Sequence, residues 1–195
     1  SVHPRSRGVV MEENIAPAIS PPSGTGENKP ANKAVLDWVH EVESLTTPEN
    51  VFWCDGSEAE NDYLLGEACR MGVLIKLNQE RRPGCYLHRS NPNDVARVEQ
   101  FTLICTPTEK EAGPTNHWAD PAETYEKLQG LLKGAMRGRT MYVVPYIMGP
   151  PDSPLAKIGF EITDSSYVVR SMRVMTTRGA ATSARIPDTA RPVVA

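Results

Sequence analysis

The chain has 195 residues, of which 39% are hydrophobic and 23% charged, and its formal net charge at pH 7 is −3. This length is enough for one well-cored domain, whereas 17 prolines and 14 glycines indicate that part of the chain is loop or tail. The small negative charge gives no overall attraction to nucleic acid or to an anionic membrane surface, and no apolar run approaches the roughly 20 residues of a membrane span. The composition therefore predicts a cytoplasmic domain that binds neither nucleic acid nor membrane.

The two ends of the chain are predicted to lack structure. Residues 1–30 form the predicted disordered leader, because they are rich in Pro, Ser, Gly and Asn and contain few large apolar side chains. Residues 180–195 have no apolar period and contain two prolines, which predicts an unstructured tail. The folded domain is expected to occupy residues 31–179.

The first helix is predicted to begin after Asn32, a good N-cap residue, and to end before Pro48. Its large apolar residues recur at helical spacing and leave the acidic residues on the opposite face. The predicted buried stripe consists of Val35, Trp38, Val39, Val42 and Leu45.

A strand, a second helix and a second strand are predicted next. Residues 51–54 read as a buried strand, and Ser57 with Glu60 forms a capping box for a helix that Gly72 ends. Residues 73–77 read as the following strand. This strand–helix–strand order predicts a βαβ unit, in which the two strands lie parallel in one sheet.

The middle of the chain alternates short strands and turns. Short strands are predicted at 85–89 and 101–106, and between them a turn at 91–94 leads into a brief helical turn at 95–100. Residues 107–117 are predicted to form a polar loop.

A further helix has the clearest start in the sequence, because Asp120 is a good N-cap, Pro121 suits the first helical position and Glu123 completes the capping pattern. Gly134 is expected to end it. Its predicted buried face consists of Tyr125, Leu128, Leu131 and Leu132.

The last elements are a strand pair and a helix. An apolar run at 140–147, interrupted by Pro145, and a second run at 156–162 flank a corner rich in Gly and Pro. A helix is then expected to begin near Ser165 and to be closed by Gly179. The whole order predicts an α/β fold with a mixed sheet and flanking helices.

The cysteines and loops of the chain predict neither a metal site nor a nucleotide site. Cys54, Cys69, Cys85 and Cys105 are scattered without a CxxC pair, so we expect reduced thiols in the core. Cys85 and His88 would face opposite sides of a regular strand and could not bind one ion. No GxxxxGK[ST] phosphate-binding loop occurs in the sequence.

Arg97 is the most specific candidate for substrate binding. It lies just before a predicted buried strand, and its planar guanidinium could hold a carboxylate through two parallel hydrogen bonds, which lysine could not do equally well. The residues alone leave an alternative open, because Arg97 and Asp94 could instead form a surface ion pair worth about 0–1 kcal/mol.

A second basic group, Lys133, Arg137 and Arg139, follows the helix that begins at Asp120. It could receive a phosphate or an acidic substrate. Favourable charge at the carboxyl end of a helix is the better explanation of this group, so we assign it no site.

Several segments have a specific sequence: DVARVE at 94–99, MRGRTMYVVP at 136–145, MGP at 148–150, SPLAKIG at 153–159, TDSSYVV at 163–169 and MRVMT at 172–176. Together they resemble the amino-terminal, substrate-binding region of GTP-dependent phosphoenolpyruvate carboxykinase, over about Val35 to Gly179. The segment DVARVE matches the DVAR-[I/V]-E motif of that family.

The resemblance implies a function for two residues. In the family, the arginine at the position of Arg97 holds the carboxylate of oxaloacetate or phosphoenolpyruvate, and the glutamate at the position of Glu99 helps a mobile lid to close. The whole enzyme would convert oxaloacetate and GTP to phosphoenolpyruvate, CO2 and GDP in gluconeogenesis, with Mn2+ or Mg2+. The nucleotide- and metal-binding motifs are expected beyond Gly179, so the chain alone is predicted to bind no cofactor and to be inactive.

Two other hypotheses remain open for the isolated chain. It could be a non-catalytic module that binds a dicarboxylate or another protein, or a truncated product without a selected role. The missing phosphate-binding loop favours these two for the chain alone. Loss of a carboxy-terminal domain would also expose apolar surface, so we expect association or poor solubility.

Overall fold

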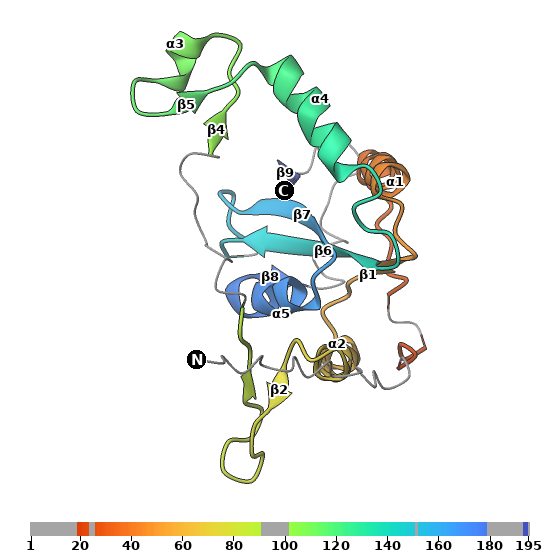
Figure 1. Cartoon of the computed structure of the whole chain (residues 1–195). Helices are drawn as coiled ribbons and strands as arrows, with labels where there is room; N and C mark the ends of the chain where they lie inside the picture. Colours follow the sequence, from red (N-terminus) through yellow and green to blue (C-terminus); the bar gives the residue numbers. More distant parts are fainter. Residues whose placement is uncertain (1–18, 24–25, 91–101, 151, 179–192, 195) are drawn as a thin grey trace, which may run out of the picture.

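The computed structural model describes residues 19–23, 26–90, 102–150, 152–178 and 193–194. A mixed sheet lies at the centre with helices on both faces, and two smaller strand pairs lie away from it (Figure 1). This confirms the predicted α/β class. In chain order the elements are α1 (Lys33–Thr46), β1 (Asn50–Trp53), α2 (Glu58–Arg70), β2 (Ile75–Lys76), β3 (Tyr86–Leu87), β4 (Leu103–Ile104), α3 (Glu109–Ala112), β5 (His117–Trp118), α4 (Pro121–Leu132), β6 (Thr140–Met148), β7 (Lys157–Thr163), α5 (Ser166–Met175), β8 (Thr177–Arg178) and β9 (Val193–Val194).

The central sheet is built around β6. The predicted strand pair is confirmed: β7 runs antiparallel to β6, with Tyr142 opposite Thr163 and Met148 opposite Lys157. Because β7 occupies one edge of β6, the other edge is shared by β1, which pairs in parallel with its first half, and β8, which pairs with Tyr146 and Ile147.

Pro145 lies inside β6 and does not break it. The carbonyl of Val143 accepts a hydrogen bond of 2.9 Å from the backbone N–H of Cys54, so the backbone of Val143 faces the β1 edge. By the two-residue period of a strand, Pro145 faces the same edge, in the gap between the residues that pair with β1 and those that pair with β8. No ladder hydrogen bond is needed there, so the missing N–H of proline costs little.

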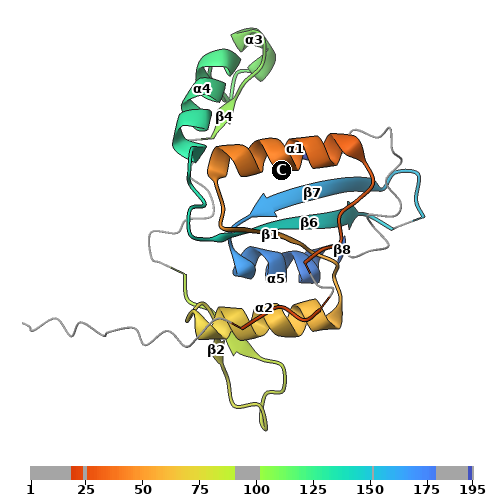
Figure 2. The ribbon, with the colours of Figure 1, turned by 90° about the vertical axis from the view of Figure 1, so that its right-hand side faces the viewer.

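The core consists of two apolar layers, one on each face of the sheet. Figure 2 shows α1 on one side of the sheet and α5 and α2 on the other. Alternate residues of β6 supply both layers, with Met141 and Val143 on one face and Tyr142 and Val144 on the other. The first layer packs against α1 and contains Val35, Val39, Trp53 and Phe160. The second packs against α2 and α5 and contains Phe52, Cys54, Leu64, Val169 and Met172.

The helix starts confirm the caps predicted from the sequence. The Asn32 side chain accepts a hydrogen bond of 3.1 Å from the N–H of Val35, and the hydroxyl of Ser57 accepts one of 3.1 Å from the N–H of Glu60. The carboxylate of Asp120 accepts from the first turn of α4, and the hydroxyl of Ser165 accepts from Val168 in α5. Each cap satisfies N–H groups that a helix leaves without partners.

The predicted βαβ unit is wrong. The parallel partner of β1 is β6, whereas β2 pairs antiparallel with β3 outside the central sheet. Within residues 73–77, Leu74 is buried, whereas Ile75 and Leu77 are exposed. The nine-residue strand β6, whose side chains are mostly buried, occupies the place beside β1 instead.

Parts of the predicted leader and tail contact the domain. The N–H of Trp53 donates to the carbonyl of Gly26 at 2.9 Å, and the N–H of Ile19 donates to the Glu67 carboxylate at 2.8 Å. In the predicted tail, β9 pairs in parallel with β7, with Val193 opposite Gly159. The domain boundaries at residues 30 and 179 stay predictions.

Three further expectations need correction. The segment 107–117 is not wholly loop, because it contains α3 and the first residue of β5. The thiols are free, as expected, but only Cys54 is buried in the core, whereas Cys85 and Cys105 are exposed. The predicted buried face of α4 is exposed, and α4 has no buried residue at all.

The parts of the chain that the structure describes contain no helix that is both long enough and apolar enough to cross a membrane.

Candidate functional site

The segment 91–101, which carries Asp94, Arg97 and Glu99, lies outside the described residues. The contacts that fix its two ends are described, and they show where the chain enters and leaves this segment. The entry follows β3 and the exit leads into β4. In Figure 1 the β2–β3 hairpin lies beyond α2 and α5, whereas β4 and β5 lie on the side of the sheet that carries α1 and α4.

His88 anchors the entry to α5. Its ring stacks on the ring of Tyr167, with centroids 4.0 Å apart and planes inclined by 24°. Its Nδ1 lies 2.7 Å from the carbonyl oxygen of Val73, and because a carbonyl can only accept, Nδ1 is the donor. These two contacts join the end of the hairpin both to its own start and to the helix beneath the sheet.

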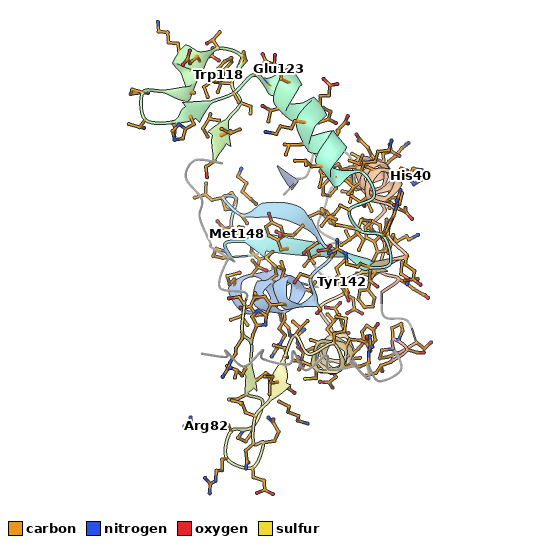
Figure 3. All side chains as sticks on the ribbon, viewed as in Figure 1. His40, Arg82, Trp118, Glu123, Tyr142 and Met148 are labelled. Carbon is orange, nitrogen blue, oxygen red and sulfur yellow. The ribbon has the colours of Figure 1, made fainter. Side chains whose placement is uncertain are left out.

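The exit is held by a small unit formed by β4, α3 and β5. Leu103 and Ile104 pair in parallel with His117 and Trp118. The indole Nε1 of Trp118 donates a hydrogen bond of 2.9 Å to the carbonyl of Thr106, which closes the turn after β4. Figure 3 shows that Arg82 in the hairpin and Trp118 in this unit lie at opposite ends of the molecule.

The turn after β1 is the place where an open α/β sheet commonly binds ligands, at the carboxyl end of a parallel strand. In this protein, the backbone N–H groups of the turn already donate to carboxylates of the chain itself. The Glu60 carboxylate accepts from the N–H groups of Asp55 at 2.5 Å and Gly56 at 3.1 Å, and the Asp55 carboxylate accepts from the N–H of Ser57 at 2.8 Å. Arg173 donates to the carbonyls of Gly56 at 2.6 Å and Ser57 at 3.2 Å. This turn is therefore a structural joint and not an anion-binding site.

The pKa of Asp55 reflects this joint. Burial by itself would raise the pKa of the carboxyl group, but hydrogen bonds with Ser57, Glu60 and the backbone of Asp55 together outweigh burial and hold the pKa below its usual value. Asp55 is thus ionised at neutral pH and serves as an acceptor within the turn.

A buried ion pair on α2 was not predicted from the sequence. The Nη2 of Arg70 lies 2.7 Å from the carboxylate of Glu67, and both side chains are largely buried. The hydrogen bonds from Arg70 lower the pKa of Glu67, whereas burial opposes this shift. The sequence does contain a pattern that could have predicted the pair, because Glu67 and Arg70 are three residues apart on a helix. Because the same carboxylate also accepts from Ile19, the pair ties residues 19–23 to the domain.

The basic group at the start of β6 has structural partners. The Nη1 of Arg139 lies 2.5 Å from the carboxylate of Asp164, next to the start of α5, and its Nη2 donates to the carbonyl of Ala135. The Nε of Arg137 donates to the hydroxyl of Thr47 at 3.4 Å, and Lys133 is the C-cap residue of α4. These contacts link the turn between α4 and β6 to neighbouring elements.

The described residues do not fit a divalent metal. Within that part of the chain, no three His, Cys, Asp or Glu side chains lie close enough together to hold one ion. Cys85 is exposed on the hairpin, and His88 is engaged by Val73 and Tyr167.

Comparison with known proteins identifies the family of the domain. Residues 37–193 match the family model described as the phosphoenolpyruvate carboxykinase N-terminal domain. The chain belongs to this family. The match includes the hairpin, the central sheet and the segment that contains Arg97.

Curated relatives of the family carry the name phosphoenolpyruvate carboxykinase [GTP]. The chain is 53% identical to the protein of Anaeromyxobacter dehalogenans over 158 residues, which are 81% of this chain and 26% of the relative. It is 53% identical to the Chlamydia abortus protein over 148 residues, or 76% of this chain and 24% of the relative. The chain thus spans about a quarter of the length of the relatives it matches.

Proposed function

We propose that this chain supplies the substrate-carboxylate-binding part of a cytoplasmic GTP-dependent phosphoenolpyruvate carboxykinase. The full enzyme would be a lyase of gluconeogenesis that converts oxaloacetate and GTP to phosphoenolpyruvate, CO2 and GDP. The observation that carries the proposal is the family match over residues 37–193, together with 53% identity over 158 aligned residues to a protein named phosphoenolpyruvate carboxykinase [GTP]. GTP and Mn2+ or Mg2+ are assigned to the full-length enzyme, and neither is assigned to this chain.

Arg97 is proposed to hold the substrate carboxylate. A guanidinium presents two parallel N–H donors that match the two oxygens of a carboxylate, which fixes the orientation of the bound molecule as well as its position. Such orientation is a main part of phosphoryl-transfer catalysis, because the attacking oxygen must lie in line with the leaving group. Glu99 is proposed to support closure of a lid over the site.

The anchored ends of the segment support this assignment. His88 attaches the entry to α5, and at the exit β4 pairs with β5. A binding arginine placed between two anchored ends needs less ordering when the substrate arrives than one on a long free loop.

The first test is binding of phosphoenolpyruvate to the 195-residue chain, measured by titration calorimetry. We expect weak, roughly millimolar binding for the isolated domain, and a loss of about 10- to 100-fold in Arg97→Ala, because a hydrogen bond to a charged group contributes about 1.5–3 kcal/mol. Arg97→Lys should retain part of the affinity, since it keeps the charge and loses the second parallel donor. Arg81→Ala, in the exposed hairpin turn, is the matched control and should bind like the unaltered chain.

Equal binding by Arg97→Ala and the unaltered chain would overturn the role of Arg97. A second assay follows the GTP- and manganese-dependent conversion of oxaloacetate to phosphoenolpyruvate, for which the isolated chain is expected to show no turnover. Arg97-dependent binding that never leads to turnover, even when the rest of a relative's chain is supplied, would favour the alternative of a non-catalytic dicarboxylate-binding or interaction module.

A further inference from the structure

Helix α4 carries an apolar stripe that no described residue covers. The stripe consists of Tyr125, Leu128, Leu131 and Leu132, which are 57%, 49%, 68% and 46% exposed. At about 100° per residue, these four side chains fall within an arc of roughly 120°, whereas Glu123, Glu126 and Lys127 lie on the opposite side. Such a stripe is the pattern of a helix that packs against another structure.

The unit next to α4 is also uncovered. Leu103 and Ile104 in β4 are 41% and 38% exposed, and because consecutive strand residues point to opposite faces, both faces of β4 are partly exposed. Figures 1 and 2 show α3, α4, β4 and β5 standing out from the body formed by the sheet, α1, α2 and α5. The six exposed residues of α4 and β4 therefore lie on one projecting part of the molecule.

The apolar stripe of α4 is held in place although it is not covered. After the helix ends, the N–H of Gly134 donates to the carbonyl of Leu45 at 2.8 Å, and the N–H of Met136 donates to the carbonyl of Thr46 at 3.0 Å. At the other end, the Asp120 carboxylate caps the helix through Ala122 and Glu123. A helix of 12 residues is only marginally stable alone. The cap closes its amino end, and the two hydrogen bonds after Leu132 attach its carboxyl end to the end of α1.

The occupant of this surface follows from the length of the relatives. The matched segment is 26% of the Anaeromyxobacter dehalogenans protein, so roughly three quarters of that chain lies outside it. A stable dimer needs about 20–30 residues on each side, far more than the six large apolar residues here. A segment of the same chain can use a smaller surface, because tethering keeps its effective concentration high.

We propose that, in a protein of the relatives' length, the part of the chain outside the matched domain packs on the apolar stripe of α4. This inference rests on the proposed function, because it takes the rest of a carboxykinase as the occupant. It assigns α4 and β4 as the docking surface and leaves the polar face of α4 in solvent.

The test compares the 195-residue chain with a full-length chimera, in which this domain replaces the matched segment of the Anaeromyxobacter dehalogenans protein. Leu131→Cys is introduced on the stripe, and Glu126→Cys on the polar face of α4 is the matched control. The rate of maleimide labelling at each position is measured by mass spectrometry of the α4 peptide. We expect Leu131→Cys to be labelled at least tenfold more slowly in the chimera, and Glu126→Cys to be labelled equally fast in both proteins.

Equal labelling of Leu131→Cys in both proteins would overturn the proposal. Protection that already occurs in the 195-residue chain and grows with its concentration would also overturn it, in favour of a second copy as the occupant. If the chimera does not unfold cooperatively, hydrophobic-dye binding by the 195-residue chain provides the second measurement. The pair Leu128→Ser and Leu131→Ser should lower dye binding, and unchanged dye binding would refute the exposed surface itself.

The two proposals fail separately, because labelling does not require catalysis. A protected but inactive chimera would count against the proposed function alone. An active chimera with an unprotected stripe would count against the docking surface alone.

Discussion

The carboxylate of Glu60 is expected to be a major source of stability in this domain, and Glu60→Ala tests this. The side chain is fully buried, and one of its oxygens accepts hydrogen bonds from the N–H groups of Asp55 at 2.5 Å and Gly56 at 3.1 Å. The backbone N–H of Glu60 donates to the hydroxyl of Ser57. One side chain thus joins the end of β1 to the first turn of α2.

The expected loss follows from these contacts. Removing the carboxylate leaves two backbone N–H groups without their acceptor, at about 1–3 kcal/mol for each group that water cannot reach. Asp55 and Gly56 are only half-buried, so water will satisfy part of this loss, and the free energy of unfolding should fall by about 2–4 kcal/mol. For a chain of this size that corresponds to a Tm lower by roughly 5–15 °C.

Two further variants make the experiment specific. Glu60→Gln keeps one oxygen acceptor, loses the charge and replaces the second oxygen with an NH2 group, so it should cost less than Glu60→Ala, at about 1 kcal/mol. Glu58→Gln alters a side chain that is 80% exposed in the same helical turn, and its ion pair with Arg173 should contribute at most about 1 kcal/mol. Urea unfolding followed by the fluorescence of buried Trp53 measures all three. If Glu60→Ala and Glu60→Gln unfolded at the same urea concentration as the unaltered chain, the reasoning would be refuted.

Three other predictions test separate parts of the fold. Because the ionised form of Glu67 is favoured in the folded state, its pKa lies below the usual 4.5; its stabilising effect is therefore present above that pH and is lost as the pH falls through the folded-state pKa. The stability gap between the unaltered chain and Glu67→Gln should accordingly narrow below about pH 4.5, and a constant gap in denaturation at several pH values would contradict this. In Gly159→Ala the new Cβ would lie 2.6 Å from the ring of Tyr146, so we expect a loss of about 1–3 kcal/mol that Tyr146→Ala largely relieves, and additive effects in a double-mutant cycle would argue against the contact. Leu64→Ala in the core should cost about 2–5 kcal/mol and Leu131→Ala less than about 0.5 kcal/mol, whereas similar losses would mean that α4 is packed after all.

Local features of the fold could be predicted from the sequence. Asn32, Ser57 and Asp120 cap helices because each side chain reaches an N–H only two or three residues away, so a short stretch of sequence contains the whole interaction. The β6–β7 pair was predictable for the same reason, since the corner at Gly149 joins the two runs directly.

Non-local features could not be predicted. Asn50 pairs with Thr140, and nothing in the residues near β1 favours this partner over the nearer run at 73–77. The apolar stripe of α4 has the same spacing as a core stripe, because the pattern indicates that a face will be covered and not what will cover it. For the site, the residues around Arg97 alone left a surface ion pair with Asp94 open, and the carboxylate-binding role came from the family resemblance and stays a prediction.

The pairing of β1 with β6 has a consequence for the order in which the chain folds. As the protein leaves the ribosome, α1, β1 and α2 emerge long before Thr140–Met148, the strand on which all three pack. Because such long-range contacts form slowly, the first half of the chain should remain without a stable tertiary structure until the β6–β7 hairpin is complete. Pulse-labelling hydrogen exchange during refolding should accordingly protect the amides of β6 and β7 before those of β1. Folding would thus begin near the carboxyl side of the domain and add the amino-terminal elements last.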